Sequence, residues 1–212
     1  MQVVSVNVGL PREVEWKEIT VSTGIFKQPV AGAVAVRKDN LAGDQQADLT
    51  VHGGPNKAVY GYASEHYPYW RAQLPEMELA WGVFGENLTT QGVSEDSLHI
   101  GDTVRVGSAV LMVVQPRMPC YKLQIRFRRD DIIQRFLASG RSGYYFSIVQ
   151  EGEVSAGAEM EILKRDENLV SVADVNRLYL GLETDAGLLR RALQVKFLPE
   201  ALRESLMKRA GR

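Results

Sequence analysis

Hydrophobic and polar residues alternate in short stretches over the first 165 residues, which is the pattern of half-buried β-strands. From Gln2 to Val8, valines alternate with Gln, Ser and Asn, so one face of an extended segment is apolar. Gly107 and Ser108 join two later stretches as a hairpin turn. Many short strands at close spacing predict a mainly β fold, a barrel or a sandwich. The further strands, separated by glycines, are expected at 18–22, 30–36, 103–106, 109–114, 144–149 and 160–163.

Helical patterns interrupt the strands twice and then follow them. Residues 64–74 are rich in aromatic side chains, and residues 131–139 place their apolar side chains on one helical face. After residue 166, a capping box at Ser171 begins a helix that ends at Gly181. Short helices cannot bury much surface alone, so we expect this tail to dock on the β part or to pair with a second subunit. Two further tail helices are expected at 184–194 and 199–209, and the expected domains are 1–165 and 166–212.

Composition excludes several classes of function. The chain has 212 residues, with 25 basic and 26 acidic side chains and a net charge of −1, so we expect no binding to nucleic-acid polymers or membrane surfaces. The N-terminal residues lack the basic region of a signal peptide, and no stretch approaches about 18 consecutive apolar residues. A single cysteine rules out an intramolecular disulfide and fits a reducing compartment. These features predict a cytoplasmic protein.

The only cysteine, Cys120, lies in the segment LMVVQPRMPCYK, residues 111–122. Prolines on both sides restrict the backbone around the thiol. Arg117 and Lys122 place two cations near the sulfur, and nearby cations favour the thiolate, the form that binds metals and attacks electrophiles. The alternative is a buried, inert cysteine that acts as a small hydrophobic side chain. The local pattern alone favours neither interpretation.

A glycine-containing segment, DLTVHGGPNKAVYGY at residues 48–62, holds a second group of candidates. His52 precedes Gly53 and Gly54, which let the backbone turn sharply and approach a ligand closely. Lys57 follows in the same turn region. Such a loop could hold a phosphate, although it lacks the Walker spacing of nucleotide triphosphatases. The alternative is a plain turn between two elements.

The segment FGENLTT, residues 84–90, holds a third candidate, Asn87. An Asn side chain both donates and accepts hydrogen bonds, which suits recognition of a heterocycle or an oxo group. It also folds readily onto its own backbone in a turn, which is the structural alternative.

Three weaker hypotheses remain open. The first is a zinc site built from His52, His66, His99 and Cys120, although no two of these residues have the spacing of zinc ligands. The second is a hydrolytic triad of Cys120, His52 and Asp48, which would make the protein a thiol hydrolase. The motifs of serine hydrolases, dinucleotide-binding folds and dithiol oxidoreductases are absent from the sequence. The basic cluster Arg126, Arg128 and Arg129 is either a solvated turn or a cationic rim for an anionic ligand.

The ordered set HGGPNKAVYGY, FGENLTT and IGDTVRVGSAVLMVVQPRMPC resembles the MOSC family, named after the C-terminal domain of molybdenum-cofactor sulfurase. The resemblance covers residues 1–165, and the helical tail is similar to the stand-alone bacterial YiiM-type branch. It implies a β-barrel that binds the molybdenum cofactor (molybdopterin), a pterin with a dithiolene and a phosphate. The family's motif cysteine, here Cys120, is implied as the catalytic residue and the molybdenum ligand.

The resemblance further implies reduction of small N-hydroxylated compounds, such as N-hydroxylated bases, at molybdenum. The chain has no flavin or iron–sulfur motif, so electrons are expected from a separate reductase. A carrier that stores or delivers the cofactor or sulfur on Cys120 without turnover is the alternative, and a homodimer is the expected assembly if the tail pairs. The expected cofactor-binding residues are His52, Gly53, Gly54, Lys57, Asn87, Arg117 and Lys122.

Overall fold

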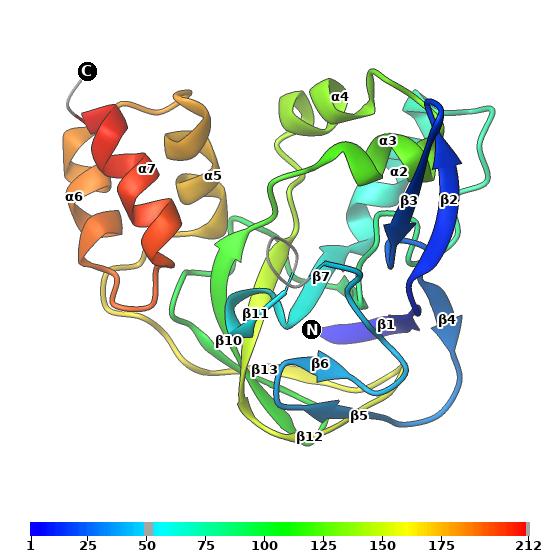
Figure 1. Ribbon diagram of the computed structural model, residues 1–212. Coiled ribbons are helices and arrows are strands. Elements are labelled where there is room, and N and C mark those ends of the chain that lie inside the picture. Colours follow the sequence, from blue (N-terminus) through cyan, green and yellow to red (C-terminus); the bar gives the residue numbers. More distant parts are fainter. Residues whose placement is uncertain (49–52, 211–212) are drawn as a thin grey trace.

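The computed structural model describes residues 1–48 and 53–210. Strands form the body of the molecule, short helices cover one end of it, and the helical tail lies at its side (Figure 1). The mainly β class with short helices and C-terminal helices is therefore confirmed.

An eight-stranded sheet in the order β13-β9-β10-β11-β7-β8-β1-β4 makes up the body. All neighbouring strands are antiparallel except β7 and β8, which run parallel. The hairpin predicted at Gly107 and Ser108 joins β9 to β10. The strands are β1 (Gln2–Val8), β4 (Gln28–Val30), β7 (Val59–Ala63), β8 (Leu88–Gln91), β9 (Thr103–Val106), β10 (Ala109–Pro116), β11 (Tyr144–Gln150) and β13 (Met160–Lys164).

The sheet curls until the beginning of its end strand β13 reaches the beginning of β1, the neighbour of the other end strand, without forming a continuous closed barrel. Residues 1–3 hydrogen-bond to residues 157–160 just before and at the start of β13, including Val3 N–H to Ala158 O at 2.9 Å and Met160 N–H to Met1 O at 2.9 Å. Only an isolated bridge, Gln2 to Glu159, pairs these segments in the described residues. The barrel expected from the resemblance is thus an incompletely closed one.

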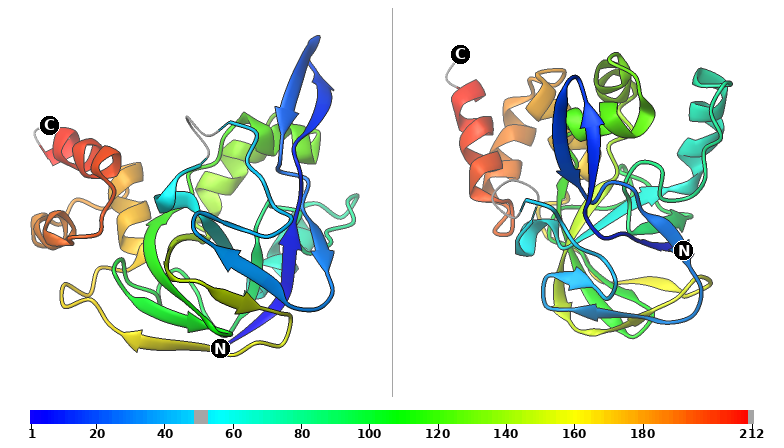
Figure 2. Two further views of the ribbon diagram at one scale, coloured as in Figure 1. Left: turned by 60° about the horizontal axis from the view of Figure 1, so that its bottom comes forward. Right: turned by 45° about the vertical axis from the view of Figure 1, so that its right-hand side comes forward.

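Two smaller sheets flank the body. One consists of β12 (Gly152–Val154), β5 (Val34–Arg37) and β6 (Asn40–Leu41). The other is a two-stranded ribbon of β2 (Arg12–Trp16) and β3 (Ile19–Thr23), which stands out from the body (Figure 2). The single strand expected at 30–36 is wrong, because Gly32 at φ 80° breaks it into β4 and β5.

Short helices cover one end of the sheet and enclose an aromatic cluster. A 3₁₀ turn, Ser64–His66, leads into α2 (Tyr67–Gln73), and α3 (Tyr121–Phe127) and α4 (Ile132–Ser139) follow β10. The rings of Tyr62, Trp70 and Phe84 are buried between them, and the Trp70 indole donates to Tyr62 Oη at 2.6 Å. The sequence analysis missed α3, which begins directly after Cys120.

The tail consists of α5 (Val172–Leu180), α6 (Ala186–Gln194) and α7 (Glu200–Ala210). The predicted capping box at Ser171 is present, with Asp174 as its partner. Backbone hydrogen bonds from Ile100 to Val170 and from Val172 to Leu98, both 2.9 Å, fix the tail to the body. Its apolar faces join the body's residues in one hydrophobic core, so the tail docks on the β part, whereas the boundary at 165/166 stays a prediction. Nowhere in the described chain is a helix both long and apolar enough to cross a membrane.

Candidate functional site

A pocket opens where β10 ends and α3 begins. Proline restricts the chain here, and Cys120 takes the N-cap position of α3 in extended conformation, at φ −124° and ψ 173°. The thiol-bearing residue is half-buried and lines the pocket together with Arg117 and Lys122. Three of the predicted site residues therefore lie together, because they share one turn of the chain.

Arg117 is fixed inside the wall of this pocket. Its side chain is 6% exposed, and its Nη1 donates to the Phe84 carbonyl at 2.6 Å and to Tyr60 Oη at 3.4 Å. The guanidinium also lies over the Tyr60 ring, 4.8 Å from the centroid. Burial acts to lower the pKa of Arg117, but Tyr60 and Tyr145 outweigh it and raise the pKa. The pocket therefore contains a permanent, immobile positive charge.

Lys122 supplies a second cation of a different kind. It is 8% exposed and lines the same pocket. Within residues 1–48 and 53–210 its ammonium has no hydrogen-bond or ion-pair partner. A buried charge is normally paired, so Lys122 offers its charge to whatever enters the pocket.

Lys27 is a third cation in the pocket that sequence reasoning missed. It is 7% exposed and forms an ion pair with Asp44. Burial lowers the pKa of Lys27, and the Asp44 carboxylate opposes this shift. No motif surrounds Lys27 in the sequence, so only the folded chain brings it to the pocket. Tyr60 belonged to a quoted motif without a role, and the structure places it and Tyr145 in the lining.

Asn87 is buried, and its side chain bonds within the protein. Its amide nitrogen donates to Asp44 Oδ2 at 2.9 Å, and its amide oxygen accepts from the Tyr60 N–H at 3.0 Å. Asn87 does not line the Cys120 pocket. These bonds tie the residue before β8 to β7 and to the segment that carries Asp44, so the side chain holds the pocket's wall in place. Its assignment as a cofactor ligand stays a prediction.

Glu86, the neighbour of Asn87, explains why the FGENLTT segment folds as it does. Its carboxylate is fully buried and accepts hydrogen bonds from the Gly82 and Phe84 N–H groups, at 2.8 and 3.1 Å, and from the Tyr67 and Thr89 hydroxyls. Burial raises the pKa of Glu86, although hydrogen bonds from the Tyr67 and Thr89 hydroxyls, the Gly82 N–H and its own backbone act against the shift. The carboxylate therefore organises the loop rather than facing a ligand.

The Gly-Gly turn lies next to β7. Gly54, at φ 85°, precedes the 3₁₀ turn Pro55–Lys57, and the Lys57 N–H donates to Gly54 O at 3.0 Å. Gly53 and Lys57 are half-buried and do not line the Cys120 pocket. The expectation for His52 falls outside the described residues, and with it the Cys120–His52–Asp48 triad. The roles of Gly53, Gly54, Lys57 and His52 stay predictions.

The other two histidines are bound elsewhere. His66 contacts Glu95, and His99 lies beside Asp102 and Arg165. Within the described ranges, no group of three or more His, Cys, Asp and Glu could hold a metal ion. A metal at Cys120 would therefore need most of its ligands from a cofactor.

Comparison with known protein families identifies the family to which this chain belongs. The model of the MOSC domain matches residues 48–161, and that of the YiiM-like 3-alpha helix domain matches residues 170–209. The chain belongs to the MOSC domain family. The resemblance noted from the sequence motifs is thereby confirmed.

Relatives of known sequence and structure agree with this MOSC assignment. The uncharacterized protein YflK of Bacillus subtilis (strain 168) is 40% identical over 99% of this chain and 95% of its own length. A protein named Reductase from Gibberella moniliformis is 33% identical over 82% of this chain, which corresponds to 32% of that protein. The crystal structure of YiiM from Geobacillus stearothermophilus matches with a TM-score of 0.81 and 33% identity, covering 99% of this chain and 98% of that one.

Proposed function

We propose that this protein binds the molybdenum cofactor at the Cys120 pocket and reduces small N-hydroxylated compounds. The Lys122 ammonium supports this proposal most directly, because it is 8% exposed and unpaired within the described ranges. An unpaired buried cation is costly, so the pocket suits an anionic ligand such as a phosphate-bearing pterin. The Cys120 sulfur beside it is a soft ligand, suitable for a metal already bound by sulfur.

The residues divide the work according to their contacts. Cys120 would ligate molybdenum, and Lys122 would hold an anionic group of the cofactor. Arg117 hydrogen-bonds to Phe84 and Tyr60, so it contributes a fixed positive charge and does not move to bind the ligand. Gly53, Gly54, Lys57, His52 and Asn87 remain proposed contributors around the cofactor. When bound, the cofactor supplies two-electron chemistry that converts N–OH to N–H, with two protons taken up and water released.

One comparison supports a link to the molybdenum cofactor, and another supports an oxidoreductase. The family takes its name from molybdenum-cofactor sulfurase, and one relative carries the name Reductase. This chain has no sequence motif for a flavin or an iron–sulfur cluster, so the two electrons are proposed to come from a separate reductase protein.

The test compares Cys120→Ser and Lys122→Ala with the wild type, all produced in a host that makes the cofactor. We expect the wild type to contain molybdenum and pterin near one per chain. Cys120→Ser should keep its fold, since Cys120 is half-buried and the change costs about 1 kcal/mol, but should lose turnover of an N-hydroxylated base. Lys122→Ala should retain less pterin after dialysis, because it lacks the cation that holds the anion.

Lys208→Ala is the matched control, since Lys208 is exposed on α7, away from the pocket. It should retain pterin like the wild type. Near-normal turnover by Cys120→Ser would eliminate Cys120 as the metal ligand. A wild-type protein that contains the full amount of cofactor but shows no turnover with a reductase partner would instead favour the carrier function.

A further inference from the structure

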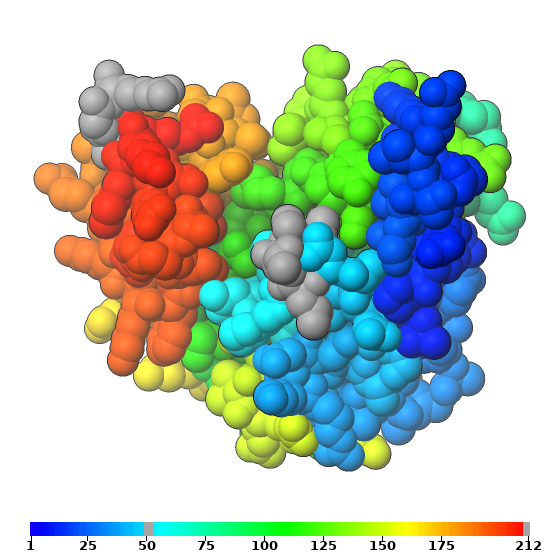
Figure 3. Space-filling view, in the orientation of Figure 1, coloured from blue at the N-terminus to red at the C-terminus, as the bar shows by residue number. Residues whose placement is uncertain are grey.

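A second cleft lies between the body and the helical tail. Its walls come from the 3₁₀ turn Ser64–His66, the segment 94–96, the end of α4 and the face of α5. The surface is notched between α4 and the tail (Figure 3). The cavity volume of about 440 Å³ lies within the range of small-molecule sites, roughly 300–1,000 Å³. It shares no lining residue with the Cys120 pocket.

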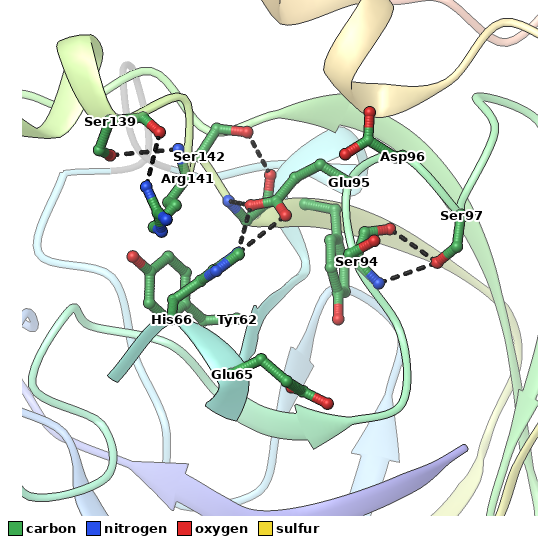
Figure 4. Close-up of polar contacts among 12 residues, drawn as sticks. Tyr62, Glu65, His66, Ser94, Glu95, Asp96, Ser97, Ser139, Arg141 and Ser142 are labelled. Carbon is green, nitrogen blue, oxygen red and sulfur yellow. Dashed lines mark hydrogen bonds and ion pairs between the residues drawn. The ribbon is translucent and has the colours of Figure 1, made fainter. Parts of the chain in front are cut away.

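One wall of the cleft is a buried carboxylate whose hydrogen bonds are formed within the protein. Glu95 Oε1 and Oε2 lie 3.0 and 2.8 Å from His66 Nε2, and Oε1 accepts the Gly143 N–H at 2.6 Å (Figure 4). The side chains of Glu95 and His66 are 5% and 13% exposed. These groups shape the wall and need no ligand.

Asn176 on α5 differs from this pair. The residue is 5% exposed and lines the cleft, yet its side-chain amide has no hydrogen-bond partner among the described residues. Among the described residues, the only side-chain polar atom that is both fully enclosed and unpaired is Arg126 Nε. The amide atoms of Asn176 are therefore accessible to solvent, and the cleft is the space that this residue lines. Because buried amides are normally hydrogen-bonded, the Asn176 amide bonds to water in the cleft and is available to a polar ligand that replaces this water.

Charged groups of both signs line the same cleft. Arg141 lies over the Tyr69 ring, 3.8 Å from the centroid, and donates to Ser139 O at 3.0 Å. Arg177 lies 3.6 Å from Asp96, whose side chain is 78% exposed. The cleft is also lined by Glu65 and by the apolar side chains of Leu137, Leu180 and Leu182. A simple anion would meet carboxylates here and a simple cation would meet guanidinium groups, whereas a zwitterion satisfies both.

We propose that this cleft binds a free α-amino acid with an apolar side chain. Its carboxylate would pair with Arg141, its ammonium group with the Glu65 and Asp96 carboxylates, and its side chain would contact the leucines. The Asn176 amide would hydrogen-bond to the polar end of the ligand. The site is separate from the Cys120 pocket and does not depend on the function proposed there.

The first experiment measures binding of L-leucine to the full-length protein by isothermal titration calorimetry. Two probes of the same shape each remove one charge: L-leucinamide lacks the carboxylate, and 4-methylpentanoate lacks the ammonium group. Each should bind at least about tenfold more weakly than L-leucine, because each leaves charged partners in the cleft unpaired. Equal binding of all three probes would contradict recognition of both charges, and no saturable binding of L-leucine at millimolar concentration would show that the cleft does not bind an amino acid.

The second experiment tests Asn176 with Asn176→Ala. Alanine favours helix more than Asn does, and the lost amide has no partner in the described chain, so the fold should remain intact in a thermal melt. L-Leucine should bind this variant roughly tenfold more weakly. Gln134→Ala removes an exposed amide from α4 outside the cleft and should bind like the wild type. Unchanged binding by Asn176→Ala would contradict the assignment.

Discussion

Three buried polar residues, Glu86, Lys122 and Asn176, show two different relations between burial and bonding. Glu86 is fully buried and accepts four hydrogen bonds from its own loop and its neighbours, so its role is to hold a loop. Lys122 and Asn176 are more than nine-tenths buried but have no side-chain partner in the described residues. Because an unsatisfied buried polar group is destabilising, these two positions are the ones at which we propose ligand binding.

The Glu95–His66 contact predicts how stability depends on pH. Burial acts to raise the pKa of Glu95, but hydrogen bonding and charge interaction with His66 outweigh it and lower the pKa below the ordinary 4.5. A depressed carboxyl pKa stabilises the fold above the unfolded-state value, and this stability is lost as the pH falls through the folded-state pKa. Thermal melts should therefore show the wild type losing stability below about pH 4.5.

Glu95→Gln is the matching variant. It removes the charged acceptor of His66 and Gly143, so at pH 7 it should be less stable by about 1.5–3 kcal/mol. The variant should also lose the part of the stability decrease at acid pH that the Glu95 carboxylate causes. A variant with the wild-type pH profile would assign the acid sensitivity to other carboxyl groups.

The sequence predicted the proximity of three candidate residues that are close together in the chain, whereas their roles stay predictions. Arg117, Cys120 and Lys122 share one turn, and the structure places all three in one pocket. Lys27 and Tyr145 were missed because the fold, not a local motif, brings them there. Asn176 was missed because an Asn in a helix has no distinctive pattern until its surroundings are known.

At the scale of elements, α3 is the clearest failure of sequence reasoning and has a physical explanation. Leu123, Ile125 and Phe127 are buried and spaced by two, which resembles a strand more than a helix over so short a stretch. The helix ends at Arg128, which is left-handed at φ 51°, where glycine is the usual signal. Strands with regular alternation, such as β1 and β9, were predicted with the bounds that the structure has.

The strained end of α3 gives a prediction about stability. Arg128→Gly should stabilise the protein by about 1 kcal/mol, because a left-handed conformation is unfavourable for residues with a Cβ atom. Arg190→Gly, in the middle of α6, should destabilise by about 1 kcal/mol, since glycine is a poor helix former. Urea denaturation of both variants measures whether each change raises or lowers the free energy of unfolding. Destabilisation by both changes would show that Arg128 makes contacts that outweigh its strain.

At the scale of the whole molecule, the tail and the body share one hydrophobic core. Val175 and Leu178 of α5 are buried in the same cluster as Val104 of β9 and Leu111 of β10. The tail's amphipathic pattern was readable from the sequence, but the surface it covers was not, since a second subunit would have explained the pattern equally well.

Removal of residues 166–212 should therefore expose apolar surface of the body and cause aggregation. Size-exclusion chromatography with light scattering measures the outcome and also reports the oligomeric state of the full chain. Removal of residues 207–212 alone is the control, because Met207, Lys208 and Arg209 are exposed at the end of α7. A chain of residues 1–165 that stays monodisperse and melts like the full protein would show that the tail is dispensable for folding.

The corner formed by Ser142 and Gly143 hydrogen-bonds to one wall residue of each pocket. The Ser142 carbonyl accepts from Tyr60 Oη at 3.0 Å, on the Cys120 side, and the Gly143 N–H donates to Glu95 at 2.6 Å, on the side of the cleft. A ligand that shifted this corner from one side would also displace a hydrogen-bond partner in the wall of the other pocket. Thermodynamic reciprocity then requires that each ligand change the affinity for the other by the same factor. Through this corner, the occupancy of one proposed site would then depend on the supply of the small molecule that binds the other.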